Sequence, residues 1–164
     1  MKKVLLLLTV VCGLSITSFA QSKKDGKFSL GLELGVPVGN ASTAYTAVVG
    51  GSLKYDLPIA PSTYFNVSVG YSSFIIKDRY KNFFSSYGAV PLKAGLKYYA
   101  DRRFFLEGQL GAAFGTANGA GTSFVYSPGV GYTFDGGLEA GVRYEAWSDN
   151  GTLGQLALRV AINL

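Results

Sequence analysis

The chain has 164 residues, enough for one domain and short for two. Charged residues make up only 15%, against roughly 25% in an average soluble domain, whereas hydrophobic residues make up 48% and glycine occurs 22 times. This composition excludes a disordered chain, which needs high charge and few aromatics, and it argues against a helical domain, which so much glycine would destabilise. The net charge of +5 is mild, and no basic–aromatic motif accompanies it, so no nucleic-acid partner is expected.

The sequence has no histidine and one cysteine, Cys12, which excludes imidazole bases, imidazole metal ligands and, once the segment holding Cys12 is removed, thiol chemistry. The acids are spread out, so neither a metal site nor a cofactor is expected. Glu139 and Glu145 are a conceivable acid–base pair. Membership of an ion network explains them better, and the protein is predicted not to be an enzyme.

Residues 1–20 have the features of a secretory signal peptide. Lys2 and Lys3 provide the positive start, an apolar stretch too short to span a bilayer follows, and Ser18 and Ala20 are the small residues that precede cleavage. The sequence therefore predicts a cleaved signal over residues 1–20 and one domain over residues 21–164.

From Phe28 onward, apolar residues occur at every second position, the period of a strand with one apolar face. This alternation predicts eight strands of about 9–13 residues, a length that suits a tilted strand crossing a bilayer. Their apolar rows span 28–38, 45–57, 65–75, 90–98, 104–114, 124–134, 138–146 and 156–164. Residues 108–134 carry no charge, but their glycines and Pro128 indicate a hairpin rather than a membrane helix.

The charged residues of the predicted strands all lie on the face opposite the apolar rows. They are Glu33, Lys54, Asp56, Lys93, Lys97, Glu107, Glu139, Arg143, Glu145 and Arg159, five acids and five bases. The interior of an eight-stranded barrel is just wide enough to be filled by side chains. The numerous apolar residues cannot fit there, so we expect them on the outer wall, with glycines, hydroxyls and this balanced ion network inside.

Many aromatic residues lie near the predicted strand ends, the placement of the two interfacial girdles of a membrane barrel. The girdle prediction includes Tyr99, Phe105 and Trp147. If both chain ends lie in the periplasm, the surface loops are residues 39–44, 76–87, 116–123 and 148–154, and the periplasmic turns are residues 58–62, 100–103 and 135–137.

Two segments carry a family resemblance. Val90–Tyr99 (VPLKAGLKYY) and Phe104–Gly111 (FFLEGQLG) are similar to consecutive strands of the outer-membrane β-barrel domain family, also called the porin family. With them the mature chain, over residues 25–164, resembles the small eight-stranded OmpA/OmpX-type barrels of the Gram-negative cell envelope. The resemblance implies an all-β fold, an antiparallel up-and-down transmembrane barrel with an apolar exterior and a polar, glycine-rich interior. It implies cell outer-membrane localisation, lipid and lipopolysaccharide as surroundings, and contact with the barrel-insertion machinery during biogenesis.

Function is less constrained by the sequence. The balanced interior favours a structural or surface-interaction barrel with a filled, non-conducting interior, and the alternative is a narrow porin-like channel for small solutes. A soluble, lipid-binding barrel also remains as an alternative. The second surface loop mixes bases with aromatics and is a possible contact site for a protein partner or for lipopolysaccharide phosphates. Its candidate residues are Lys77, Arg79, Tyr80, Lys81, Phe83 and Phe84.

Overall fold

The computed structural model describes residues 26–77, 86–117 and 119–164. The predicted signal peptide lies outside them, as do Arg79, Tyr80, Lys81, Phe83 and Phe84 of the predicted loop site. The described elements are β1 (Lys27–Val38), α2 (Ala41–Ala44), β2 (Tyr45–Ala60), β3 (Thr63–Ile76), β4 (Tyr87–Tyr99), β5 (Phe104–Gly115), β6 (Thr122–Thr133), β7 (Leu138–Asp149) and β8 (Gly151–Asn163).

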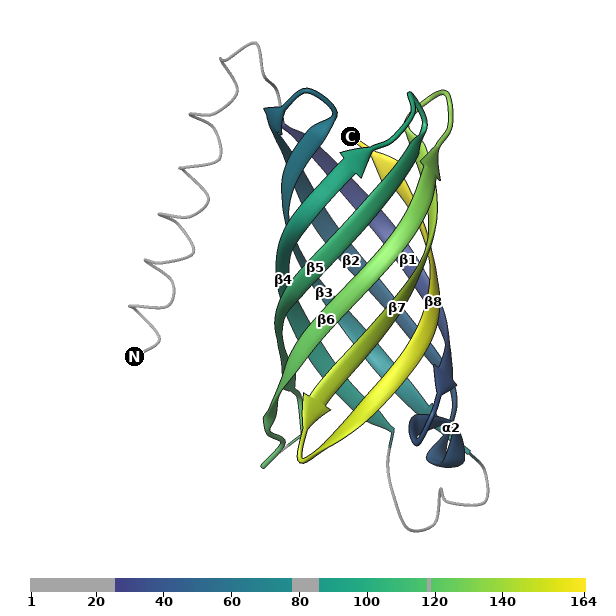
Figure 1. Cartoon of the computed structure of the whole chain (residues 1–164). Coiled ribbons are helices and arrows are strands. Elements are labelled where there is room, and N and C mark those ends of the chain that lie inside the picture. Colours follow the sequence, from purple (N-terminus) through teal and green to yellow (C-terminus); the bar gives the residue numbers. More distant parts are fainter. Residues whose placement is uncertain (1–25, 78–85, 118) are drawn as a thin grey trace.

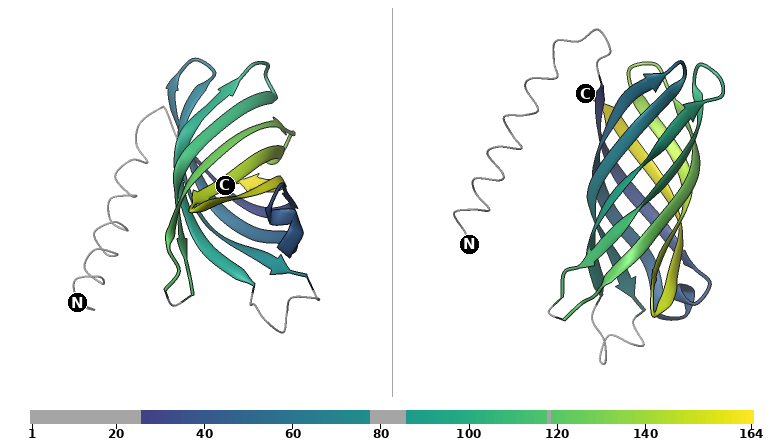
Figure 2. Two further views of the ribbon diagram at one scale, coloured as in Figure 1. Left: turned by 60° about the horizontal axis from the view of Figure 1, so that its bottom comes forward. Right: turned by 60° about the vertical axis from the view of Figure 1, so that its left-hand side comes forward.

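The eight strands form one closed barrel (Figures 1 and 2). Each strand pairs antiparallel with the next along the chain, and β8 pairs with β1 to close the cylinder, for example through Leu34 opposite Leu158. The predicted eight-stranded up-and-down barrel is confirmed. Within the described ranges, no helix is long and apolar enough to cross a membrane.

The two faces of the wall differ sharply in chemistry. Leu32 is 75% exposed on the outside, whereas its neighbour Glu33 is 6% exposed on the inside. The outer wall carries exposed Leu, Val, Ile, Phe and Tyr side chains from all eight strands. This arrangement confirms the apolar exterior and the polar, glycine-rich interior. It arises because successive side chains of a strand point to opposite faces of the sheet.

The barrel has two distinct ends. We call one the turn end, because the short turns at 61–62, 100–103 and 134–137 lie there together with Gly26 and Leu164 (upper end in Figure 1). The opposite loop end carries α2, the last residues of β3 and β5 and the first residues of β4 and β6. The predicted loop at 148–154 is wrong: β7 runs to Asp149 and β8 begins at Gly151, because Asp149 and Gly151 pair directly and leave only Asn150 as the turn.

Inward-facing glycines allow neighbouring strands to pack closely where the lumen is crowded. A Cβ on Gly95 of β4 would collide with the backbone of β5, at the carbonyl oxygen of Gly108 and at 2.7 Å from the Cα of Gln109. Gly108 itself faces outward, and a Cβ there would meet nothing within 4 Å. The inner wall therefore depends on glycine at position 95 for space.

The girdle prediction is wrong for some of its aromatic residues. Trp147 is 1% exposed and Phe105 is 5% exposed, both inside the barrel, and the hydroxyl of Tyr99 lies 3.0 Å from that of Thr133 on the inner wall. The reason is strand phase, since Trp147 lies two residues after Glu145, and Phe105 two residues before Glu107. Other members, such as Phe104 and Tyr98, are exposed on the outside.

Candidate functional site

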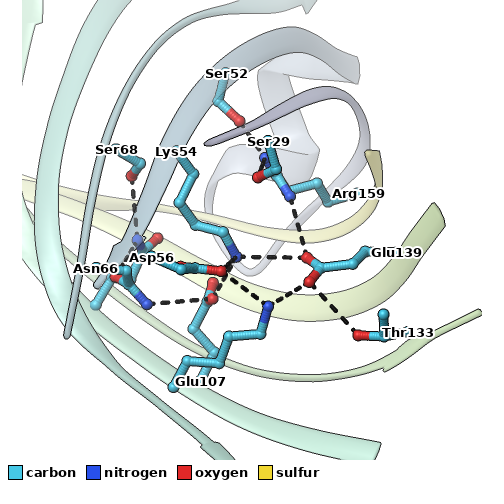
Figure 3. A network of polar contacts seen from close by, with 12 residues as sticks. Ser29, Ser52, Lys54, Asp56, Asn66, Ser68, Glu107, Thr133, Glu139 and Arg159 are labelled. Carbon is cyan, nitrogen blue, oxygen red and sulfur yellow. Dashed lines mark hydrogen bonds and ion pairs between the residues drawn. The ribbon is translucent and has the colours of Figure 1, made fainter. Parts of the chain in front are cut away.

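The lumen of the barrel holds the predicted charged residues. Its turn-end half contains three bases and three acids, and Figure 3 shows Lys54, Glu139 and Arg159 among them. The Nζ of Lys54 lies 2.6 Å from Oε2 of Glu107. The Nζ of Lys97 lies 3.0 Å from Oδ2 of Asp56 and also bonds Oε1 of Glu139. The aromatic ring of Phe105 lies beneath Lys97, with its centroid 4.2 Å from Nζ, and adds a cation–π contact. Arg159 completes this group.

A second group lies nearer the middle of the barrel. Nη2 of Arg143 lies 2.6 Å from Oε2 of Glu33 and 3.1 Å from Oε2 of Glu145. Lys93 bonds the same oxygen of Glu145. Arg159 connects the two groups, because its side chain lies 3.7 Å from Glu33 and 3.9 Å from Glu139. All ten charged residues therefore belong to one chain of ion pairs, which we call the ion network.

Neutral side chains complete the hydrogen bonding of the ion network. The amide of Gln109 donates to Oδ1 of Asn66 at 2.8 Å and to Ser68 at 3.1 Å, and Asn66 in turn donates to Glu107. Ser52 donates to Glu33 at 2.6 Å. A buried charge is tolerated when it is both paired and hydrogen-bonded. These neutral residues provide the additional hydrogen bonds.

The principal ion pairs join strands that are not neighbours. Lys54 of β2 reaches Glu107 of β5, and Lys97 of β4 reaches Glu139 of β7. Lys93 of β4 likewise reaches Glu145 of β7. Such pairs cross the lumen, so they fill it as well as neutralising it.

A cavity of about 20 Å³ remains inside the ion network. Oε2 of Glu139 and Nε of Arg143 both belong to its lining residues and have no hydrogen-bond partner in the described protein. Lys54 lies 3.8 Å from the same oxygen of Glu139. A space of this size with two to four polar partners suits a single water molecule.

Between the ion network and the loop end, the interior is mostly apolar and carries no member of the ion network, although Ser72 and Ser123 are buried there. Phe74 and Trp147 form its centre, with ring centroids 5.0 Å apart in an edge-to-face contact. We call this group the apolar plug; its buried members are Val48, Phe74, Ala89, Ala113, Val125 and Trp147, with Tyr45, Tyr87 and Leu153 packed against them. The sequence did not lead us to expect it, although Phe74 shares its phase with the inward-facing Ser68 and Ser72.

The turn end opens into a recess of about 510 Å³. Tyr64, Tyr99 and Arg102 are among its lining residues, and Asp56 and Glu139 of the ion network also border it. Solvent at this end therefore approaches the ion network directly.

Only one of the predicted loop-site residues lies in the described ranges. Nζ of Lys77 donates to the carbonyl oxygen of Ser42 at 2.6 Å, which ties the end of β3 to α2. In the described part of the chain, no three Asp, Glu, Cys or His side chains gather as metal ligands do.

No protein-family model matches the sequence. No curated protein is significantly similar to it. Solved structures are similar in fold.

The crystal structure of Ail, the attachment invasion locus protein of Yersinia pestis, superposes with a TM-score of 0.60 at 17% identity, covering 85% of this chain and 97% of Ail. The outer-membrane enzyme PagL gives 0.61 at 15% identity, covering 82% of this chain and 98% of PagL. The N-terminal barrel of Pseudomonas aeruginosa OprF gives 0.58 at 14% identity, covering 85% of this chain and all of that barrel. This chain therefore has the fold of the small eight-stranded outer-membrane barrels.

Proposed function

We propose that this protein is an integral outer-membrane barrel that does not conduct solutes and serves a structural or surface-interaction role. The observation that carries the proposal is the filled lumen: five acids and five bases pair across it, and apolar side chains occupy the rest. A space of about 20 Å³, room for one water molecule, remains among Lys54, Glu139 and Arg143.

The energetics of the ion network support a closed state. Removing one partner of a buried ion pair costs about 3–5 kcal/mol, because it leaves a charge without compensation. A solute passing through the lumen has to separate several such pairs at once, since Glu139 and Glu145 each contact two or more bases.

The location in the outer membrane is supported by the apolar outer wall and by the fold of the similar barrels. A closed barrel leaves no unpaired strand edge in hydrocarbon. The proposal includes a cleaved signal peptide over residues 1–20, insertion by the barrel-insertion machinery, and lipid with lipopolysaccharide around the wall. A soluble lipid-binding barrel is disfavoured, because such a barrel needs its apolar side chains inside.

A catalytic role has little support in the lumen. PagL is an enzyme with a similar fold, but this chain has no histidine. The carboxylates of Glu139 and Glu145 are 3% and 0% exposed and are held by Lys97 and by Lys93 with Arg143. They serve the ion network in this proposal.

The second candidate function is a narrow channel for small solutes. The recess at the turn end favours it, because about 510 Å³ of open volume leads to Asp56 and Glu139. Such a channel requires the ion pairs and the apolar plug to move aside together.

Conductance in planar bilayers separates the two functions. We expect the mature protein, folded in lipid and verified by its altered gel migration before boiling, to leave the bilayer insulating. Stable single-channel openings of the wild-type protein would contradict the proposed function and favour the channel. Recovery of the mature protein from cells in a soluble fraction without detergent would contradict the membrane location.

A further inference from the structure

The interior fills the barrel in two chemically different layers, and six consecutive strands contribute to the apolar layer. On β2, Val48 lies nearer the loop end than Lys54 and Asp56 do, and on β7 Trp147 lies nearer it than Glu139 and Arg143 do. Phe74, Ala89, Ala113 and Val125 hold the corresponding positions on β3, β4, β5 and β6. The apolar plug therefore covers the loop-end side of the ion network around most of the circumference.

The apolar plug is densely packed. Phe74, Ala89, Ala113 and Val125 are 0% exposed, and Trp147 is 1% exposed. The ring of Phe74 contacts three other aromatic rings, those of Tyr45, Tyr87 and Trp147, with centroids 5.3, 6.3 and 5.0 Å away. The contacts of Phe74 with Tyr45 and Trp147 are edge-to-face, a geometry that stabilises aromatic pairs beyond the area they bury.

The one polar atom of the Trp147 side chain is already bonded. Nε1 of Trp147 donates to Oε1 of Glu145 at 2.8 Å, and Gln155 donates to the same oxygen at 3.3 Å. This bond fixes the indole to the ion network, so the facing rings of Phe74 and Trp147 offer an ion only carbon surface.

The two layers present unequal obstacles to an ion. Within the ion network, a cation meets carboxylates and an anion meets ammonium and guanidinium groups, so part of the lost hydration is replaced. Within the apolar plug, no charged group replaces it, and transfer of an uncompensated ion into apolar surroundings is very costly. Hydrophobic constrictions close channels by this means.

The two ends of the barrel also differ in access. The recess at the turn end brings solvent to Asp56 and Glu139, which belong to the ion network. The apolar plug separates the same network from the loop end. An ion that enters from the turn end therefore meets its last and highest obstacle at Phe74 and Trp147.

We propose that the apolar plug centred on Phe74 and Trp147, rather than the ion network, is the main barrier to ion permeation through this barrel. The proposal deepens the proposed function and rests on the wild-type barrel being closed. It assigns to two residues a role in permeability that the charge pattern of the sequence does not indicate.

The test is the conductance of plug variants in planar bilayers. We expect Trp147→Ala and Phe74→Ala each to produce ion-conducting openings, with mean conductance raised by about tenfold or more over the wild-type protein, because each variant removes a ring from the hydrophobic constriction. Trp147→Phe is the matched control: it also loses the bond to Glu145 but retains a ring, and we expect it to stay closed. Folding of every variant is verified by its altered gel migration before boiling.

A charge variant distinguishes the two layers. Lys54→Gln combined with Glu107→Gln removes a pair that bonds at 2.6 Å while preserving net charge and polarity. We expect it to raise conductance less than either plug variant does. The inference is overturned if folded Trp147→Ala and Phe74→Ala remain as insulating as the wild-type protein, or if the charge variant conducts as well as they do. A conducting wild-type protein would instead overturn the proposed function itself.

Discussion

The inner and outer walls of this barrel are made by alternate residues of the same strands, yet they are stabilised by opposite means. On β1, Leu32 points outward and is 75% exposed, while Glu33 points inward and bonds Arg143 and Ser52. The outer wall depends on an apolar surrounding medium, because its exposed hydrocarbon side chains are unfavourable in water. The inner wall depends on partners within the protein, so a substitution there has consequences on the far side of the lumen.

The largest effect is expected from breaking the ion network at Lys97, which bonds two buried carboxylates. Lys97→Met leaves the carboxylates of Asp56 and Glu139 buried without the ammonium group between them. Loss of one partner from a buried ion pair lowers the free energy of unfolding by about 3–5 kcal/mol. Urea unfolding in lipid vesicles measures this change.

Lys27→Met is the matched control for this variant. Lys27 lies exposed at the start of β1 beside the recess, and we expect its replacement to leave the unfolding midpoint unchanged. Equal effects of the two variants would contradict the role given to the ion network.

The next effect tests the outer wall. Leu32→Arg places a charge in the middle of β1 on the apolar face, which costs about 2–4 kcal/mol near the bilayer midplane. Leu57→Arg makes the same change near the turn end of β2, where the cost falls to about 0–1 kcal/mol. If unfolding in vesicles gave Leu32→Arg no larger cost than Leu57→Arg, the apolar outer wall would not lie in the hydrocarbon.

A smaller change in the free energy of unfolding is expected from alanine substitutions at two glycines. They lie on adjoining strands and face opposite ways. Gly95→Ala forces a Cβ against the backbone of β5 inside the lumen, and overpacking of this kind costs about 1–3 kcal/mol. Gly108→Ala faces outward into open space. A glycine in a strand interior weakens the strand, so we expect this variant to be neutral or slightly stabilising. The comparison fails if both variants change the free energy of unfolding equally.

Most side chains of the inner and outer walls could be assigned from the sequence, because strand phase determines the wall on which a side chain lies. The phase placed Glu33, Lys93 and Glu107 inside and Leu32 outside. The same phase would have placed Phe105 and Trp147 inside, but their aromatic character and their positions near strand ends led to the girdle prediction. The apolar plug was missed for a related reason, since an inward-facing Phe74 departs from a polar inner row.

The partners within the ion network were not predictable. Lys54 and Glu107 are 53 residues apart and lie on strands that do not pair. Their contact depends on closure of the barrel and on the strand stagger that closure requires. A single sequence reveals the sign and the face of each charge, whereas the pairing is a property of the closed cylinder.

The smallest effect is expected from an ion pair outside the lumen. Arg103 and Asp135 pair at 2.9 Å in two turns at the turn end, with side chains 48% and 85% exposed. Solvent and salt screen such pairs, so many of them contribute nothing measurable to stability. We expect Asp135→Asn to leave the unfolding midpoint unchanged at both low and high salt. The loss caused by Lys97→Met persists at high salt, because salt screens a buried pair much less than an exposed one. A salt-sensitive loss in the Lys97 variant would mean that mobile ions reach the ion network. The buried ion pairs would then differ from the exposed Arg103–Asp135 pair only in how strongly salt screens them.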